Sequence, residues 1–156
     1  MDPKPEISVV VPSYRGADRL RRFLPTLVHE LTEVAPTILR RTPTVEVVIV
    51  DDGSPAGERR RLVEVVNRGR RSPTVRYTTV CLPRNYGQRL ATIVGVVTAQ
   101  GGLIATIDDD GGHPPRELLR MVALMERAPT LELIYGAPAV PAGGEVTGRR
   151  SVRRIG

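Results

Sequence analysis

Aromatic residues and cysteine are scarce in this sequence. Its 156 residues include no Trp, one Phe and one Cys. Single-stranded nucleic acids are usually bound on exposed aromatic rings, so this composition argues against such a platform. The lone Cys81 excludes an internal disulfide and fits a reducing compartment. Because it lies in an apolar run, we interpret Cys81 as a small core residue rather than a nucleophile.

Long apolar runs and two familiar nucleotide-binding motifs are also absent. The longest apolar run, residues 91–99, is broken by Thr92 and Gly95 and is too short to span a bilayer. The N-terminus does not resemble a signal peptide, so we expect a soluble, cytoplasmic chain. The sequence has no GxGxxG after its first apolar run and no GxxxxGK[ST] anywhere, which removes the signatures of dinucleotide-binding and P-loop proteins.

Arginine dominates the charge of the chain, whose formal net charge is +6. A basic surface favours anionic partners such as nucleotides, lipid phosphates or nucleic acid, without choosing among them. Because aromatic rings are so few, we expect no specific nucleic-acid partner. The length suits one domain with a substantial core.

Apolar runs alternate with amphipathic segments along the chain. This alternation predicts an α/β fold with a mostly parallel central sheet flanked by helices. The expected strands are residues 7–11, 45–50, 75–82, 103–107 and 131–135. The expected helices are residues 18–31, 57–67, 88–99 and 115–127.

Several local features are predicted along with these elements. Asp18 can cap the first helix, and Pro25 should kink that helix or mark a late start. Residues 36–44 are expected to form a basic, proline-bearing loop. Helix 88–99 has small and apolar residues on most faces, which predicts a buried helix. Residues 137–148 read as a Gly/Pro-rich loop, and the basic tail 149–154 receives no assigned structure.

Polar residues follow four of the expected strands. They belong to Pro12-Ser13-Tyr14, Asp51-Asp52-Gly53, the loop at residues 84–87, and Asp108-Asp109-Asp110. Because ligands of parallel α/β sheets bind outside the carboxyl ends of the strands, we expect these four loops to gather on one rim.

The three consecutive acids predict a cation site. Adjacent carboxylates repel each other unless positive charge neutralises them. Asp108 and Asp110 have the spacing to share a Mg²⁺ or Mn²⁺ ion, which prefers carboxylate and phosphate oxygens. The alternative is that these acids are stabilised by the dipole of the following helix. The acids that end the neighbouring strand favour the functional interpretation.

Two of the other three loops offer groups for a nucleotide. Asp52 can accept a hydrogen bond from a base or a ribose hydroxyl, or simply form an Asx turn, and the sequence does not separate Asp51 from Asp52. Arg84 offers a positive fork for phosphate or a base carbonyl, unless it is one more solvated arginine. Gly87 and Gln88 open a helix whose free N–H groups can face a phosphate.

Four motifs in this order resemble family 2 glycosyltransferases, especially their polyprenyl-phosphate branch. They are ISVVVPSY (residues 7–14), VDDGS (50–54), RNYGQ (84–88) and IDDDGGHPPRE (107–117). The resemblance covers about residues 6–136 and implies a GT-A domain over residues 1–136, with residues 137–156 starting a missing acceptor-side segment.

The resemblance also implies ligands and residue roles. The donor would be a nucleotide-diphosphate sugar, and the metal would be Mg²⁺ or Mn²⁺. Pro12, Ser13, Tyr14, Asp51, Asp52, Gly87, Gln88 and Asp109 would bind the nucleotide. Asp108 and Asp110 would form the D-x-D pair that holds the metal, and these two with Arg84 would be the catalytic residues.

Two positions depart from the family pattern. Gly112 stands where the family often has a metal-binding glutamine, and the family's Gly-Ser-Arg-Tyr after the fifth strand is replaced by GAPAV at residues 136–140. These departures keep open a non-catalytic nucleotide-sugar-binding fragment of a split or degraded enzyme. The many arginines keep open a basic polyanion-binding domain.

The expected reaction is an inverting transfer of the sugar to an acceptor. A polyprenyl-phosphate acceptor is favoured because it is already anionic and needs no general base. The basic tail is expected to make peripheral contact with the inner face of the membrane.

Overall fold

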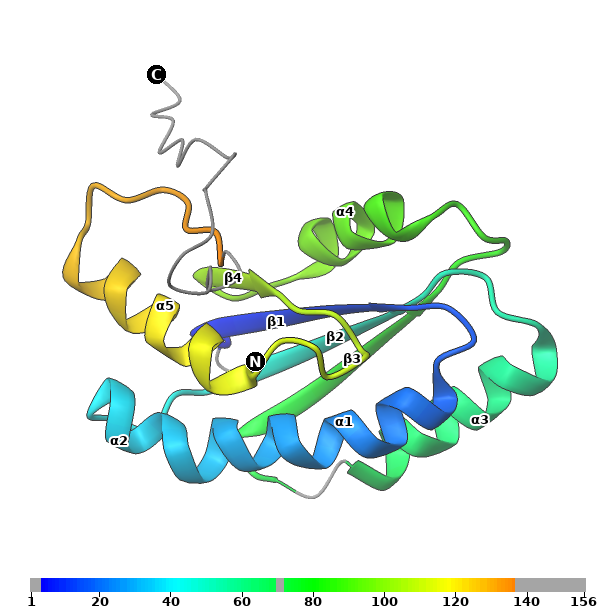
Figure 1. The fold of residues 1–156 in the computed structure, drawn as a ribbon, viewed down its shortest axis with the longest axis horizontal. Coiled ribbons are helices and arrows are strands. Elements are labelled where there is room, and N and C mark those ends of the chain that lie inside the picture. Colours follow the sequence, from blue (N-terminus) through cyan, green and yellow to red (C-terminus); the bar gives the residue numbers. More distant parts are fainter. Residues whose placement is uncertain (1–3, 70–71, 137–156) are drawn as a thin grey trace, which may run out of the picture.

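The computed structural model describes residues 4–69 and 72–136. Four parallel strands form one sheet in the order β3-β2-β1-β4 (Figure 1). They are β1 Ile7–Ser13, β2 Val45–Asp51, β3 Val75–Cys81 and β4 Leu103–Thr106. The α/β class and the parallel sheet predicted from the sequence are confirmed.

The two central strands carry the most continuous apolar runs. Every residue of β1 and β2 is buried, whereas the edge strands β3 and β4 are only partly buried. A strand covered on both faces needs apolar side chains on both, which explains the unbroken valine and isoleucine runs.

Helices cover the two faces of the sheet unequally. The helical elements are α1 Ala17–His29, the π-helical segment η1 Glu30–Val34, α2 Ala35–Leu39, α3 Ala56–Gly69, α4 Gln88–Thr98 and α5 Pro115–Arg127. α1, α3 and α5 enclose the larger core with one face of the sheet. α4 lies on the opposite face, over a small cluster that includes Val10, Val50 and Ala91 (Figure 1).

The predicted fifth strand is wrong. Residues 131–136 have no regular secondary structure, and Leu133 and Tyr135 are exposed. An apolar run forms a strand only where a neighbouring edge accepts its backbone hydrogen bonds, and the apolar pattern alone does not reveal that edge.

The start and end of the first helix also differ from the prediction. Gly16 occupies the N-cap position, whereas Asp18 lies in the first turn and pairs with Arg61 at 2.8 Å. Pro25 lies inside α1, which starts at Ala17, so the helix has no late start. Pro36 falls in the first turn of α2 rather than in a loop, because a residue there needs no N–H donor.

The prediction of a buried fourth helix is wrong for its outer face. In α4 only Ala91 and Gly95 are buried, while Ile93 and Val97 are exposed. Apolar composition on every face does not reveal which faces other elements cover.

Within residues 4–69 and 72–136, no helix has both the length and the apolar character that a membrane crossing needs. The predicted loop at 137–148 and the basic tail at 149–154 lie outside the described residues.

Candidate functional site

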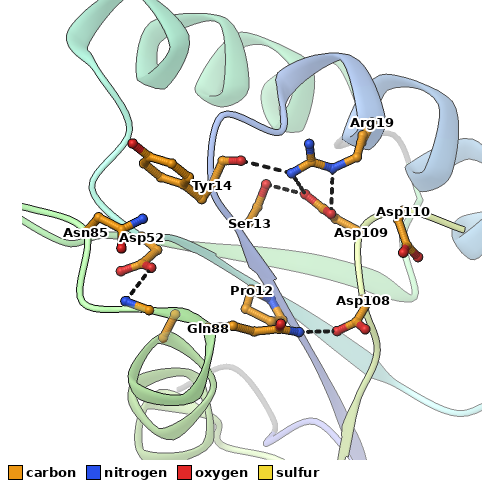
Figure 2. Close-up of a pocket in the computed structure, with 12 residues that line it drawn as sticks. Pro12, Ser13, Tyr14, Arg19, Asp52, Asn85, Gln88, Asp108, Asp109 and Asp110 are labelled. Atoms are coloured by element: carbon orange, nitrogen blue, oxygen red, sulfur yellow. Dashed lines mark hydrogen bonds and ion pairs between the residues drawn. The ribbon is translucent and has the colours of Figure 1, made fainter. Parts of the chain in front are cut away.

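The four polar loops meet around one cavity at the carboxyl ends of the strands, as predicted. The cavity has a volume of about 530 Å³ (Figure 2), a size typical of small-molecule sites. It is lined by Pro12, Ser13, Tyr14, Arg19, Asp52, Asn85, Gly87, Gln88, Ala91, Asp108, Asp109 and Asp110.

Asp52 holds the loop before α4 against the end of β2. Its two carboxylate oxygens accept the backbone N–H groups of Tyr86 and Gly87, each at 2.8 Å. The loop comes so close that a Cβ on Gly53 would lie 2.0 Å from the Arg84 carbonyl carbon, and Gly53 has a φ of +70°. Only glycine suits this turn. Asp52 thus shapes the cavity that it lines, and each of its oxygens has a lone pair that these two bonds leave free.

Asp51 has a different environment from its neighbour. Its side chain is fully buried, and it accepts hydrogen bonds from Arg59 Nε at 3.0 Å and from the Ser54 N–H at 3.2 Å. Arg59 also donates to the carbonyl of Leu82 at 2.8 Å. Asp51 therefore ties β2 to α3 and to the end of β3, and Asp52 is the one of the pair that lines the cavity.

Asp109 is neutralised within the protein. It accepts a hydrogen bond from the Ser13 hydroxyl at 2.5 Å and pairs with Arg19 Nε at 2.8 Å (Figure 2). The hydrogen bond to Asp109 is the main cause of the raised pKa of Arg19, and the charges of Asp109 and Asp110 add to it against the cost of burial. This network fixes the end of β4 to β1 and α1.

Gly16 makes room for that network. A Cβ at this position would lie 2.0 Å from Ser13 Oγ and 2.3 Å from Asp109 Oδ2. These distances are far below van der Waals contact, so any larger residue would displace the bonded groups.

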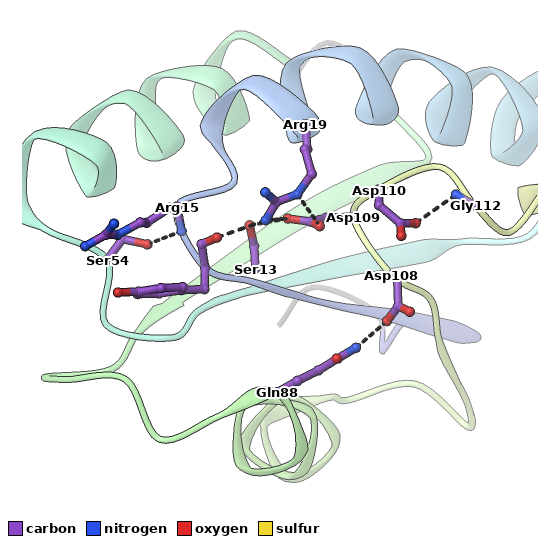
Figure 3. Close-up of polar contacts among 10 residues, drawn as sticks. Ser13, Arg15, Arg19, Ser54, Gln88, Asp108, Asp109, Asp110 and Gly112 are labelled. Carbon is purple, nitrogen blue, oxygen red and sulfur yellow. Dashed lines mark hydrogen bonds and ion pairs between the residues drawn. The ribbon is translucent and has the colours of Figure 1, made fainter.

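Asp108 and Asp110 have no cationic partner among the described residues. Asp108 accepts a hydrogen bond from Gln88 Nε2 at 2.6 Å, and Asp110 accepts one from the Gly112 N–H at 2.8 Å (Figure 3). The carboxylates of Asp108 and Asp109 turn to opposite sides, toward Gln88 and Arg19 respectively. Two unpaired carboxylates therefore remain at the cavity wall, with charge available for a cation.

These two carboxylates fit a Mg²⁺ or Mn²⁺ ion that shares its coordination with a bound phosphate. In the part of the chain that the structure describes, no three His, Cys, Asp or Glu side chains are grouped to hold a metal by themselves. Mg²⁺ is commonly held by one or two carboxylates together with substrate phosphates and water, so a protein pair is sufficient for such a site.

Two predicted site residues lie outside the cavity lining, and three lining residues were not predicted. Arg84 is exposed and stacks over the Tyr86 ring at 4.7 Å, and Asp51 is buried away from the cavity. Of the unpredicted residues, Asn85 lies within a recognised motif and could have been found there. Arg19 and Ala91 lie on helices, and only the fold brings them to the site.

The comparisons with known proteins identify a family. The model of "Glycosyl transferase family 2" matches residues 8–153. Undecaprenyl-phosphate 4-deoxy-4-formamido-L-arabinose transferases are similar in sequence. The protein from Pseudomonas savastanoi pv. phaseolicola is 35% identical over 78% of this chain and 33% of its own length. The protein from Yersinia pestis is 31% identical over 80% of this chain and 35% of its own length.

Solved structures share the fold. The mannosyltransferase PcManGT from Pyrobaculum calidifontis, in complex with GDP-Man and Mn²⁺, has a TM-score of 0.62 and 22% identity over 83% of this chain and 34% of its own. TarS from S. aureus has a TM-score of 0.57 and 21% identity, over 78% of this chain and 32% of its own. The GT-A fold predicted from the sequence is thereby confirmed.

The chain spans about a third of the length of the curated relatives it matches. The family model nevertheless covers most of its residues, including all four loops around the cavity. This chain therefore belongs to glycosyl transferase family 2.

Proposed function

We propose that this chain binds a nucleotide-diphosphate sugar together with Mg²⁺ or Mn²⁺ and serves in an inverting transfer of the sugar to a polyprenyl phosphate. One observation carries the proposal: Asp52 and Asp110, from the ends of different strands, line the same cavity. A nucleotide that fills the cavity can therefore contact both the base-side and the metal-side carboxylates.

We assign the donor's two ends to opposite sides of the cavity. Pro12, Tyr14 and Asp52 contact the nucleoside. Asp52 takes one further hydrogen bond from the base or the ribose, on lone pairs that the Tyr86 and Gly87 N–H groups leave free. At the start of α4, the Gln88 N–H faces the phosphate. The Gly87 N–H is committed to Asp52, so Gly87 contacts the nucleotide through its remaining atoms. The prediction that Arg84 binds phosphate requires its guanidinium to leave the Tyr86 ring.

Asp108 and Asp110 would hold the metal. When bound, a divalent ion offsets the charge that develops on the departing diphosphate, as a Lewis acid. Asp109 contributes indirectly, because its bonds to Ser13 and Arg19 fix the turn that carries the two metal ligands. Ser13 reaches the cavity wall but its hydroxyl is committed to Asp109, so we assign its nucleotide contact to the remaining atoms of the residue.

The acceptor class is supported by the sequence relatives, whose names specify undecaprenyl phosphate. A phosphate oxygen that attacks the anomeric carbon in line is anionic at neutral pH, so it needs no general base. Such an acceptor resides in a membrane, and we propose that the chain works at the cytoplasmic surface.

A fragment that binds the donor without catalysis is the second candidate, favoured by Gly112, which stands where the family often has a metal-binding glutamine. Calorimetry with UDP and GDP, with and without Mn²⁺, tests the common basis of both proposals. Metal-dependent binding with sugar transfer to a polyprenyl phosphate supports the enzyme, and the same binding without transfer supports the fragment. Salt-sensitive binding to any polyanion, without a metal effect, would overturn both.

A further inference from the structure

The side chain of Gln88 links the start of α4 to the acidic turn that follows β4. Its Nε2 donates a hydrogen bond to Asp108 Oδ1 at 2.6 Å, and both residues line the cavity (Figure 3). Because a carboxylate only accepts hydrogen bonds, the NH₂ end of the amide is the end that faces Asp108. An amide is neutral, so this bond orients the carboxylate without placing a positive charge beside it.

The three consecutive acids differ in the charge of the groups that hold them. Asp109 is held by the Arg19 guanidinium at 2.8 Å, which neutralises it. Asp108 is held by the neutral amide, and Asp110 accepts a hydrogen bond from the neutral Gly112 N–H at 2.8 Å. The described donors therefore orient all three acids but cancel the charge of the middle one alone.

The backbone that carries Gln88 is fixed by contacts that do not involve the acidic turn. Asp52 accepts the N–H groups of Tyr86 and Gly87, each at 2.8 Å, and so holds the residues just before the helix. One turn further on, Ala91 is buried in the small cluster between α4 and the sheet. The amide thus extends from an anchored backbone, and it restricts the position of its partner carboxylate before any ion binds. Such preorganisation lowers the cost of binding.

We propose that Gln88 is a positioning residue for the metal site, which holds the Asp108 carboxylate by a neutral donor and leaves its charge available to Mg²⁺ or Mn²⁺. The inference rests on the proposed function, since it requires Asp108 and Asp110 to hold the metal. Replacing a group that orients a metal ligand usually lowers metal affinity about 10–100-fold. Because the Gln88–Asp108 bond is exposed, we expect the lower end of this range.

Two substitutions at position 88 separate orientation from charge. Gln88→Leu removes the side-chain donor but keeps the backbone N–H that we assign to phosphate. Gln88→Lys keeps a donor and adds a positive charge. Gln100→Leu is the matched control, because Gln100 is an exposed glutamine outside the cavity lining. Calorimetry with UDP and with GDP, in the absence and presence of Mn²⁺, gives two affinities for each variant, and their ratio is the Mn²⁺ effect.

Gln88→Leu should lower the Mn²⁺ effect about tenfold. Its metal-free affinity and melting temperature should stay at the parent values, because Gln88 is exposed and its phosphate contact comes from the backbone. Gln88→Lys should have opposite effects on the two quantities. Its metal-free affinity should rise, since a cation then lies beside the phosphates, while its Mn²⁺ effect should fall, since Asp108 is neutralised. Gln100→Leu should match the parent.

The outcomes distinguish the role of Gln88 from the metal site itself. An unchanged Mn²⁺ effect in either Gln88 variant would overturn the positioning role, and so would a loss in Gln88→Leu that is equal with and without Mn²⁺. In these cases the proposed function stands if Asp108→Asn and Asp110→Asn lose the Mn²⁺ effect. A parent without any Mn²⁺ effect, or a full effect in both aspartate variants, would overturn the metal site and this inference with it.

Discussion

The Ser13 hydroxyl donates a hydrogen bond to Asp109 at 2.5 Å, although 96 residues separate the two in sequence. The bond joins the carboxyl ends of β1 and β4, and Arg19 on α1 completes it with an ion pair at 2.8 Å. The middle acid of the DDD motif is therefore internal to the protein, and the two outer acids remain for a ligand.

Replacing Asp109 should weaken the fold more than replacing an exposed paired acid. Asp109→Asn leaves Arg19 without its hydrogen-bonded charged partner and should cost about 1.5–3 kcal/mol, the usual value for a hydrogen bond to a charged group. Asp18→Asn is the control, since Asp18 pairs with Arg61 on the surface, where water and salt screen the pair and it contributes little to stability. Urea unfolding measures both. Equal losses would contradict the structural role of Asp109.

The glycine that makes room for this network gives an independent test. Gly16→Ala would put a Cβ 2.0 Å from Ser13 Oγ, and overpacking of this kind costs about 1–3 kcal/mol. A Cβ on Gly57, within α3, would meet no atom within 4 Å. Gly57→Ala should therefore be neutral or stabilising, by up to about 1 kcal/mol, because alanine is the better helix former. Similar melting temperatures for the two variants would refute the account of Gly16.

Sequence patterns predicted the sheet and the rim of the site because both depend on local rules. Continuous valine runs predicted the central strands, and acids at the strand ends predicted the cavity, since parallel strands bring their carboxyl ends to one edge. The strand predicted at residues 131–135 does not form, because strand formation depends on a partner edge elsewhere in the fold.

The individual roles of the acids were harder to predict. Asp51 and Asp52 differ in their partners, Arg59 for one and the 86–87 backbone for the other, and neither partner is evident from local sequence. Arg19 shows the same limit, since 90 residues separate it from Asp109.

At the other end of the strands, Glu46 organises a buried network. It accepts hydrogen bonds from Ser8 Oγ at 2.9 Å, Thr78 Oγ1 at 2.7 Å and the Gln100 N–H at 3.0 Å. Glu46→Gln replaces one acceptor oxygen by a donor and should cost about 1–3 kcal/mol. Nucleotide binding should be unchanged, because Glu46 does not line the cavity. Glu64→Gln, on the exposed surface of α3, is the control.

Thermal unfolding and calorimetry of Glu46→Gln and Glu64→Gln separate an effect on stability from an effect on nucleotide binding. If Glu46→Gln lost nucleotide affinity at a temperature where it is folded, the Glu46 network would not be independent of the cavity, contrary to the prediction. A melting temperature equal to that of Glu64→Gln would show that the buried acceptor contributes nothing to stability.

Tyr77 should make the protein less stable at alkaline pH. Burial raises its pKa from 10.0 to about 12, so the unfolded chain loses the proton first. The stability that this difference in pKa contributes is fully present below pH 10. It is lost as the pH rises toward 12, because the unfolded state then binds fewer protons than the folded state. Tyr77→Phe should flatten the decline of unfolding free energy between pH 9 and 11, measured with urea at each pH. Tyr135→Phe, at an 80% exposed position, should leave the decline unchanged. Parallel declines in Tyr77→Phe and the parent would refute the prediction.

The proposed metal ligands give the most direct test of the site. Asp110→Asn should remove the effect of Mn²⁺ on UDP or GDP affinity, since an amide oxygen is a neutral and weaker ligand for a hard cation. We expect a loss of at least tenfold in the presence of Mn²⁺, equivalent to about 1.4 kcal/mol, and little change in its absence. Asp108→Asn should behave likewise.

Glu117→Gln is the control, because Glu117 is an exposed acid outside the cavity lining. Asp110 is itself exposed and unpaired, so its replacement should leave the melting temperature unchanged. Undiminished Mn²⁺ stimulation in both aspartate variants would remove the assignment of the D-x-D pair.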